Sequence, residues 1–422
     1  MTMLNPGRPA KGLPDAELRD ATARAALAYF WDFAHPDSGM ARERSAGSFG
    51  YDAAQVVTSG GSGFGIMALI VGAERGWLPR AAVADRIAKI AAFLERADKH
   101  RGIFPHFMDG TTGKTVPFSP TDDGGDLVET SFLMAGLLAA RQGFPEREDI
   151  VMPVNRLWRA ADWAAHVRAE DGGLMWHRSE AHPWQPTSLP IRGWNESLIT
   201  FVLAAGSPTH PIAPAIYHQS WAKAEEFVNG RDYDGIRLPL GPEKGGPLFL
   251  AHYSFLGIDP RGLKDDYADY GEQVRAHALV NRAHCIANPG GFDGYGPACW
   301  GLTASDSTVG YSAHSPTNDI GVITPTGAVA SMPFVPEEAM AALRHFVDDR
   351  GDALWGPFGL ADAFAPGTDW VAPGTLAIDQ GPIVVMLENY RSGLMWDLLM
   401  SASEVRTGLT RLGFTSPRLA SA

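Results

Sequence analysis

The sequence predicts an all-α fold in which a ring of buried helices is surrounded by a ring of amphipathic helices. Segments with apolar residues at spacings of three and four recur along the chain, as one face of an α-helix requires. Two kinds of helix alternate among them: helices that are apolar on nearly every side, and helices with one apolar stripe and one charged face. A double ring of this kind, a toroid, leaves its long loops at one end to form a cleft. The expected helices are 15–35, 62–76, 80–99, 126–142, 153–169, 194–205, 216–228, 262–287, 336–349 and 378–402.

The two kinds of helix differ clearly in composition. The nearly all-apolar segments, expected inside, are GSGFGIMALIVGAERGW (61–77), DLVETSFLMAGLLAARQ (126–142) and WNESLITFVLAAG (194–206). The segments with a charged face, expected outside, include AAVADRIAKIAAFLERADKH (81–100) and EEAMAALRHFVDDRG (337–351). Helix starts are marked by Asp15 and Pro153, because Asp and Pro fill the first positions of a helix without losing a needed hydrogen bond.

Long connections rich in Gly and Pro separate the helices, and loops of this length in a compact domain are usually functional. The connections are 102–125, 170–193, 229–249 and 288–335. Within the last of them, GVITPTGAVAS (321–331) is expected to add short strands. No low-complexity linker or charge run divides the chain. We therefore expect one domain over 1–422, with 1–14 as a flexible N-terminal extension.

The composition excludes several classes of partner. The 48 acidic residues outnumber the 35 basic ones, giving a formal net charge of -13. Nucleic acid and membranes are therefore not expected partners, because binding phosphates needs clustered Lys and Arg. Cys285 and Cys299 lack the spacing of a disulfide framework or a zinc site. The N-terminus resembles no secretion leader. The expected compartment is the cytoplasm for the sequence as written, or the periplasm if a leader has been removed.

The densest acidic motif is SPTDDGGDLVETSF (119–132), which holds Asp122, Asp123, Asp126 and Glu129. In a purely structural interpretation, Asp126 caps a helix with Glu129 at its third position, worth about 1 kcal/mol. Four carboxylates at one helix start exceed what capping needs, and their repulsion raises at least one pKa unless a cation or donors compensate. That is how a general acid is made.

The same motif also fits the DDxxD spacing that class I terpene synthases use to hold magnesium diphosphate. That interpretation needs a second metal motif, and NDIGVIT (318–324) lacks the required acidic residue. The two glycines within the acidic motif also suit a loop rather than a helix interior. We therefore predict no metal site and no cofactor.

A second acidic position is Glu196 in IRGWNESLIT, directly after Trp194 and Asn195 at the entrance to an apolar helix. It could be no more than a first-turn Glu stabilised by the helix dipole. Glycoside hydrolysis, however, needs one carboxylic acid to protonate the leaving oxygen and a second carboxylate, with aromatic faces for the sugar. The Trp directly beside Glu196 favours this second interpretation.

Two further stretches supply candidate substrate contacts. GGPLFLAHYSFLGIDP (245–260) contains His252, Tyr253 and Phe255, although a lone His is more often a hydrogen-bonded core residue than a catalyst. NPGGFDGYGPACWGLTASD (288–306) is read as a pocket wall with Trp300 and Asp306 as sugar contacts, the alternative being an ordinary surface loop.

Along most of its length the chain resembles the glycoamylase-like proteins of glycoside hydrolase family 144, the β-1,2-glucanase family. The motifs that carry the resemblance are GGDLVETSFLMAGLLAAR, RGWNES, HYSFLGIDPRGLKDDYADY, WGLTASD, GVITPTGAVASMPF, GPFGLADAF and AIDQGPIVVMLENYRSGLMW, the last of which includes the candidate contact Tyr390. The resemblance implies an (α/α)6 toroid and hydrolysis of β-1,2-glucosidic bonds with inversion. It places the acidic site on Asp122, Asp126, Glu129 and Glu196, with Asp126 and Glu196 as the central pair.

Several alternatives remain open at this level. The enzyme is either endo-acting or exo-acting and sophorose-releasing, and which carboxylate is acid and which is base is not fixed. A transglycosylase would use similar carboxylates while excluding water. A non-catalytic β-glucan-binding homologue would keep the aromatic residues, and a lyase or epimerase would need a Tyr or His base.

Overall fold

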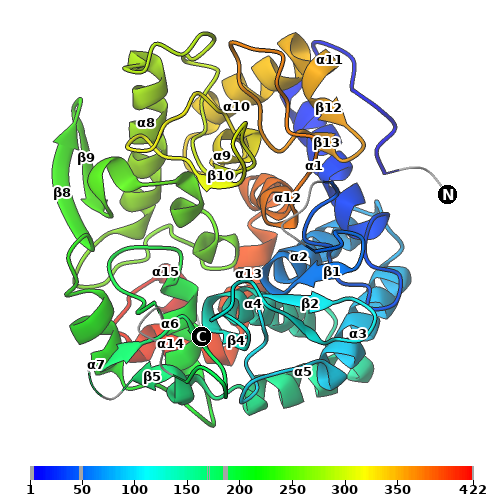
Figure 1. Cartoon of the computed structure of the whole chain (residues 1–422), viewed down its shortest axis with the longest axis vertical. Coiled ribbons are helices and arrows are strands. Elements are labelled where there is room, and N and C mark those ends of the chain that lie inside the picture. The colour runs from blue at the N-terminus through cyan, green and yellow to red at the C-terminus, as the bar shows by residue number, and fades with distance from the viewer. Residues whose placement is uncertain (1–3, 47–50, 169, 171, 184–188, 421–422) are drawn as a thin grey trace.

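The computed structural model of the chain is a double ring of helices, which confirms the predicted all-α class (Figure 1). It describes residues 4–46, 51–168, 170, 172–183 and 189–420. Along these residues, outer and inner helical segments alternate, as in an (α/α)6 toroid. The inner segments are α2 (Ser59–Glu74), α4 (Leu127–Gly143), α6 (Leu198–Gly206), η4 (Leu248–Ala251) with η5 (Ser254–Leu256), α9 (Pro325–Val329) and α12 (Ala377–Arg391). The outer segments are α1 (Asp15–Trp31), α3 (Arg80–Arg96), α5 (Glu148–Ala160), α7 (Pro214–Ile216) with η2 (Tyr217–Trp221), α8 (Tyr270–Ala287), and α10 (Pro336–Arg344) with η6 (His345–Asp349).

Burial separates the two rings in the way that the composition predicts. In the inner helix α2, 14 of 16 residues are buried, whereas in the outer helix α3 only 7 of 17 are. The buried residues of α3 lie on one stripe, because its other face meets solvent. The apolar inner helices therefore form the core, and the outer helices cover it.

Glycines allow the inner helices α2 and α4 to pack backbone against backbone. A Cβ atom placed on Gly63 would lie 2.1 Å from the carbonyl oxygen of Phe132, and one on Gly136 would lie 2.3 Å from that of Gly63. No larger residue fits at either position without moving a helix. This contact fixes the separation of the two helices a few residues below their N-terminal ends.

Several helix boundaries differ from the prediction. The helix expected from 153 begins at Glu148, so Pro153 lies inside α5 rather than at its start. The helix expected over 194–205 begins only at Leu198. The helix expected over 262–287 begins at Tyr270, because Asp269 caps it by accepting hydrogen bonds from the backbone amides of Gly271 and Glu272.

The C-terminal helices are also divided differently. The helix expected over 378–402 is broken at Gly393, whose φ of 75° is left-handed, into α12 and α13 (Leu394–Ser401). The remaining helices, which were not predicted separately, are η1 (Trp163–His166), η3 (Glu243–Gly245), α11 (Gly351–Leu354), α14 (Ser403–Arg411) and α15 (Pro417–Ala420).

Two of the expected connections contain regular structure instead. Within 229–249 lies a hairpin of β8 (Val228–Tyr233) and β9 (Ile236–Leu240), whose turn residues Asp234 and Gly235 both have positive φ, as a type I′ turn requires. The strands expected in 321–331 are wrong, because α9 begins there with Pro325 at its first position. The connection 170–193 falls partly outside the described residues.

The other strands are short and antiparallel, and they fix the loops at one end of the toroid. They are β1 (Val56–Thr58) with β2 (Phe107–Asp109) and β3 (Thr115–Val116), β4 (Gly125–Asp126) with β7 (His177–Arg178), β5 (Val167–Arg168) with β6 (Gly173–Leu174), β10 (Ala304–Ser305) with β11 (Ser312–Ala313), and β12 (Trp355–Gly356) with β13 (Gly359–Leu360).

The N-terminal segment from residue 4 onward contacts the outer ring. Leu4 is buried, and the side-chain amide of Asn5 donates hydrogen bonds to the carbonyl oxygens of Gly356 and Pro357 at 2.9 and 2.8 Å. Among the described helices, none combines the length and apolar character that crossing a membrane would need.

Candidate active site

A cavity of about 240 Å³ opens where the inner helices begin. Its wall includes Glu129 in the first turn of α4, Glu196 just before α6, and Ile378 at the start of α12. The positive ends of these helix dipoles therefore point toward it, which favours carboxylates at this position. The charged side chains in the wall are Glu43, Arg44, His106, Glu129 and Glu196, and the aromatic ones are Tyr51, Phe107, Phe118, Phe132, Trp176, Phe249, Tyr253 and Tyr311.

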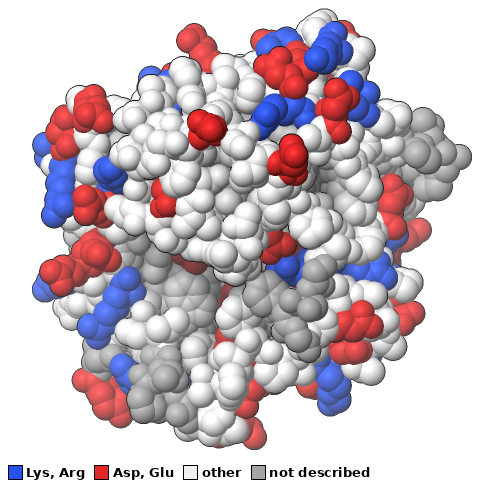
Figure 2. Space-filling model, turned by 45° about the horizontal axis from the view of Figure 1, so that its top comes forward, with Lys and Arg blue, Asp and Glu red and all other residues white. Residues whose placement is uncertain are grey.

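The outer surface around this end carries charges of both signs. Figure 2 shows Lys and Arg side chains interspersed with Asp and Glu around the periphery, while the middle of this face is largely uncharged. Aromatic walls with a few carboxylates suit a neutral polyhydroxylated ligand better than a polyanion.

Asp126 is the structural centre of the first acidic cluster, which we define as Asp122, Asp126 and Glu129. It is the N-cap of α4, and its Oδ1 accepts hydrogen bonds from the backbone amides of Val128 and Glu129 at 3.0 and 2.9 Å. Its Oδ2 lies 3.0 Å from His106 Nδ1. Asp126 has no exposed surface, so it stands behind the cavity wall rather than in it.

Glu129 brings the first acidic cluster to the cavity. Instead of folding back to close a capping box, its Oε2 accepts a hydrogen bond from the backbone amide of Gly60 at 2.8 Å and lies 3.5 Å from Thr58 Oγ1. A Cβ atom on Gly60 would lie 2.5 Å from this oxygen, so the glycine is what admits the carboxylate. Burial raises the pKa of Glu129, although His106 opposes the shift.

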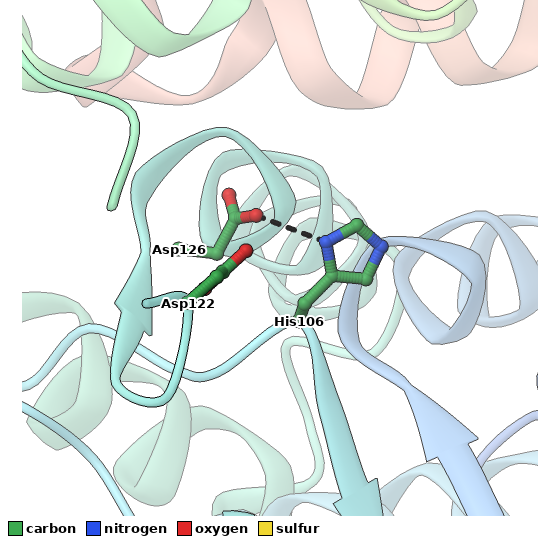
Figure 3. A group of neighbouring side chains, drawn as sticks. All are labelled: His106, Asp122 and Asp126. Atoms are coloured by element: carbon green, nitrogen blue, oxygen red, sulfur yellow. Dashed lines mark hydrogen bonds and ion pairs between the residues drawn. The ribbon is translucent and has the colours of Figure 1, made fainter. Parts of the chain in front are cut away.

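Asp122 lies in the loop before β4 and points toward Asp126 and His106 (Figure 3). Its carboxyl is buried, and its Oδ1 has no hydrogen-bond partner among the residues that the structure describes. Burial and the neighbouring Asp126 raise the pKa of Asp122 to about 7. A carboxyl in this environment holds a proton near neutral pH.

His106 is the basic side chain beside the three carboxyls. Burial alone would lower its pKa, but Glu129 and the hydrogen bond with Asp126 raise it to about 9. The ring is stacked on Phe118, with centroids 4.5 Å apart and planes 15° from parallel. The carbonyl oxygen of His106 accepts a hydrogen bond from the amide of Ser59 at 3.1 Å, which ties its strand to the start of α2.

His106, Asp122 and Asp126 lie close enough together to be considered as a metal site. One ligand atom from each lies within 4.8 Å of the others, and His with carboxylates is an ordinary ligand set. However, His106 Nδ1 and Asp126 Oδ2 are already at hydrogen-bonding distance, and Asp126 Oδ1 caps α4. A cation would have to displace the hydrogen bond that joins the pair, so we read the group as a proton site.

Glu196 faces the cavity from the turn that precedes α6. Its side chain is half-buried and lies in the cavity wall. Burial raises its pKa to about 7, with a further contribution from the negative charges of Glu129 and Asp126. Glu196 is thus coupled to the first acidic cluster and has the pKa of a general acid at neutral pH.

A second acidic cluster, Glu43, Asp306, Asp362 and Asp379, lies at another side of the cavity. The buried Arg44 guanidinium donates to both oxygens of Glu43, at 2.7 and 3.1 Å, and to both oxygens of Asp306, at 3.0 and 3.1 Å. The hydroxyl of Tyr51 donates to Glu43 at 2.7 Å. Glu43 and Arg44 reach the cavity wall, while Asp306 lies behind them.

Asp362 and Asp379 form the buried base of the second acidic cluster. Asp362 Oδ2 accepts a hydrogen bond from the backbone amide of Asp306 at 3.1 Å. Burial is the main cause that raises the pKa of Asp362 to about 7. Burial and the charge of Asp362 place the pKa of Asp379 well above its usual value. This pair holds at least one proton at neutral pH.

The structure gathers some of the predicted site residues at the cavity and places others elsewhere. Glu129, Glu196 and Tyr253 line the wall, whereas Asp122, Asp126 and Asp306 lie behind it. The aromatic candidates Trp194, Phe255 and Trp300 are buried in the core, where Trp194 stacks on Trp221 with centroids 5.7 Å apart.

The remaining predicted contacts have structural partners. His252 is buried, with Nε2 2.9 Å from Ser331 Oγ. Asn195 Oδ1 accepts the backbone amide of Ser197 at 3.1 Å and shapes the turn before α6. Tyr390 lies twelve residues after Ile378 on α12, a rise of about 18 Å, beneath the guanidinium of Arg19.

The sequence did not single out several residues that the structure brings to the site. They are Glu43, Arg44, Tyr51, His106, Phe107, Phe118, Trp176, Phe249, Tyr311, Asp362 and Asp379. A usable signal existed only for those in the long connections that we expected to be functional, namely His106, Phe107, Phe118, Trp176, Phe249 and Tyr311. The pairing of Arg44 with Asp306 joins positions 262 residues apart, which no local pattern reveals.

Comparison with known proteins agrees with this geometry. Residues 188–403, half of the chain, match the Glycoamylase family model, described as "Putative glucoamylase". An exo β-1,2-glucooligosaccharide sophorohydrolase (non-reducing end) of Parabacteroides distasonis is 42% identical over 425 residues. The match covers 95% of this chain but only 58% of that protein's length.

Two solved structures resemble the chain over nearly its whole length. A protein of Bacteroides uniformis, also described as a putative glucoamylase, is 53% identical with a TM-score of 0.93, covering 97% of this chain and 100% of that one. An endo-β-1,2-glucanase of Chitinophaga pinensis, solved with sophorotriose and glucose, is 47% identical with a TM-score of 0.93 and the same coverage.

Proposed function

Because the chain belongs to the glycoamylase-like family of β-1,2-glucanases, glycoside hydrolase family 144, we propose that it hydrolyses β-1,2-glucosidic bonds of β-1,2-glucan or sophorooligosaccharides. One observation carries this proposal: carboxyls from distant parts of the chain meet at one aromatic cavity, and one of them, Glu196, has a pKa of about 7. Such a group is protonated in a useful fraction at neutral pH and can protonate a leaving glycosidic oxygen.

We assign the proton donor to Glu196 and the activation of water to Glu129. Both are in the cavity wall, as groups that touch substrate must be. Glu43 also reaches the wall, but its oxygens already accept three hydrogen bonds from Arg44 and Tyr51, which occupy lone pairs that a base would use to take a proton from water.

Asp126, which the sequence places in the central pair, has a different part in this assignment. Its oxygens are taken by the start of α4 and by His106, and it has no surface in the cavity. We propose that Asp126 positions Glu129 and His106, and that it does not contact the reacting water.

In this mechanism the aglycone oxygen takes the proton of Glu196 while a water molecule, deprotonated by Glu129, attacks the anomeric carbon from the opposite face. The attack inverts the anomeric configuration, so the first product is the α-anomer. Aromatic side chains such as Tyr253 and Phe249, whose rings stack with centroids 5.1 Å apart, offer apolar faces to the sugar rings.

The proposal is tested by incubating the protein with linear β-1,2-glucan and with sophorooligosaccharides, while the anomeric protons are followed by NMR. Early release of α-anomers supports inverting hydrolysis. Early release of β-anomers would exclude inversion but would leave hydrolysis standing. Sophorose as the sole early product would identify exo action, and a ladder of lengths would identify endo action. Products longer than the substrate would indicate a transglycosylase. Binding without any product would sink the enzymatic proposal.

A further inference from the structure

The first acidic cluster concentrates negative charge in a buried space. Asp122, Asp126 and Glu129 all face the same imidazole, that of His106, which each of them influences electrostatically. Carboxylates buried this close together cannot all be ionised without a compensating cation. The identity of that cation therefore decides which carboxyl is charged.

The geometry around His106 holds its ring in one place. Nδ1 is 3.0 Å from Asp126 Oδ2, one ring face is covered by Phe118, and Phe107 packs against the ring at 4.5 Å between centroids. The backbone is held by the hydrogen bond from Ser59. The imidazole cannot turn away from Asp126 without breaking these contacts.

Asp122 differs from Asp126 in its hydrogen bonds. Asp126 accepts from two backbone amides through Oδ1 and lies 3.0 Å from His106 Nδ1 through Oδ2, so both of its oxygens have partners. Asp122 Oδ1, in contrast, is buried and has no hydrogen-bond partner within the described part of the chain. An unpartnered buried oxygen is costly when charged and much less costly when the carboxyl is protonated.

We propose that His106 is a positioning residue of the hydrolytic site: as an imidazolium it donates its Nδ1 hydrogen to Asp126, and the proton of the acidic cluster is then held by Asp122. The effect on turnover rests on the proposed function, whereas the charge state of His106 does not. The directions of the pKa shifts agree, since that of His106 is raised to about 9 and that of Asp122 to about 7.

The consequence for catalysis passes through Glu129. His106 lowers the pKa of Glu129 against the effect of burial, and Asp126 caps the helix turn that carries Glu129. Removing the imidazolium therefore makes Glu129 harder to ionise and delays its action as a base to higher pH. The groups that face the imidazole are Asp126 and Glu129 of α4, Asp122 of the preceding loop, and the uncharged rings of Phe107 and Phe118.

Two substitutions separate charge from hydrogen bonding. His106→Asn places an amide nitrogen near the position of Nδ1, so it keeps a donor for Asp126 and removes the charge; His106→Ala removes both. The matched control is His284→Gln, which alters another buried His–Asp pair, His284 Nε2 with Asp319 at 3.0 Å, outside the cavity wall.

The experiment measures kcat and KM of the full chain on β-1,2-glucan from pH 5 to 9, and the protonation of His106 in the parent by 15N NMR of the imidazole. For His106→Asn we expect kcat at pH 7 to fall at least tenfold, KM to stay within about threefold, and the acidic limb of the profile to move upward by about one pH unit. The kcat of His106→Ala at pH 7 should fall further, and the kcat and pH profile of His284→Gln should match those of the parent.

Two results would overturn the proposal: an imidazole that is neutral at pH 7, or a His106→Asn profile that superimposes on that of the parent. If circular dichroism shows that neither His106→Asn nor His106→Ala folds, the NMR titration of the parent alone decides whether His106 is charged at pH 7. If the parent turns over neither substrate, the proposed function fails, while the same titration still decides the charge of His106.

Discussion

The two acidic clusters of the cavity contain similar side chains but are neutralised by different cations. In the first, His106 lies against Asp126 and its charge depends on pH; in the second, the buried Arg44 joins Glu43 to Asp306 and keeps its charge at every working pH. The cation of the second cluster therefore keeps a constant charge, whereas that of the first cluster titrates. The comparison shows that the partner of a carboxylate, rather than the local density of acids, determines what it can do.

Within the second cluster, too, carboxylates differ according to their partners. Asp306 shares two hydrogen bonds with Arg44, whereas Asp362 and Asp379 lie deeper. Burial dominates there and raises the pKa of both carboxyls. The same residue type is thus paired with a permanent cation at one position and is a proton carrier a short distance away.

The largest expected effect on turnover comes from substituting Glu196. Glu196→Gln removes the proposed proton donor while keeping the shape of the wall, so we expect kcat on β-1,2-glucan to fall by about 10³-fold. Calorimetry with sophorooligosaccharides should still detect binding. Glu272→Gln, an exposed first-turn position of α8, is the control and should retain parental rates. A Glu196→Gln enzyme with near-parental kcat would exclude Glu196 as the acid.

The next largest effect is expected from removing the constant cation. Arg44→Met leaves Glu43 and Asp306 as buried unpaired charges, so the free energy of unfolding should fall by about 3–5 kcal/mol, measured by urea denaturation. The control is Arg156→Met, which breaks an exposed pair with Glu95 (2.6 Å) and should cost at most about 1 kcal/mol. Equal losses in both variants would mean that Arg44 is no more important than a surface residue.

The pH dependence of activity distinguishes the two walls. Glu196, with a pKa of about 7, acts in its protonated form, so kcat/KM should fall about tenfold per pH unit above that value. Arg44 keeps its charge in this range and should add no further limb. The rates of parental enzyme from pH 5 to 9 test this, and an undiminished rate at pH 9 would contradict it.

A smaller effect is expected on stability. The folded-state pKa of Asp122, about 7, exceeds the unfolded value of about 3.9, so the folded state binds this proton more tightly. Its contribution to stability is complete below the unfolded pKa and is lost as pH rises through 7. The parent should lose about 2 °C more of Tm than Asp122→Asn between pH 5 and 8, measured by scanning calorimetry. If the Tm of both proteins fell by the same amount over this pH range, the proton could not be assigned to Asp122.

No effect is expected from chelation. Because His106, Asp122 and Asp126 are read as a proton site, EDTA should leave turnover unchanged. The assay is sophorose release after dialysis against the chelator, with a mock-dialysed sample alongside. Loss of activity that one divalent ion restores would instead make these three residues a metal site.

The sequence predicts the fold well where burial acts on a whole helix. The apolar character of α2, α4 and α6 on all sides is visible locally, and so is the charged face of α3. The sequence fails where an inner position is filled by short turns, as in η4, η5 and α9, because these have too few residues to show a period.

The site is predicted only in part for a related reason. Asp126 and Glu129 share one motif, and a capping pattern is local. The assignment of Trp194 and Trp300 to the substrate could not be made from composition, since buried aromatics fill a large core as readily as a sugar cleft. His106 meets Asp126 only because β2 is paired with β1 beside the start of α2.

The glycine contact between α2 and α4 sets how the cavity can change in size. Gly63 packs against the backbone of Phe132, and Gly136 packs against the backbone of Gly63, so the two helices form one rigid unit. Gly60 and Glu129, at the cavity end of this unit, therefore keep their spacing. Adaptation to longer or shorter sugars must therefore come from the loops around the rim rather than from these two helices. The catalytic end can thus stay constant while substrate preference changes around it.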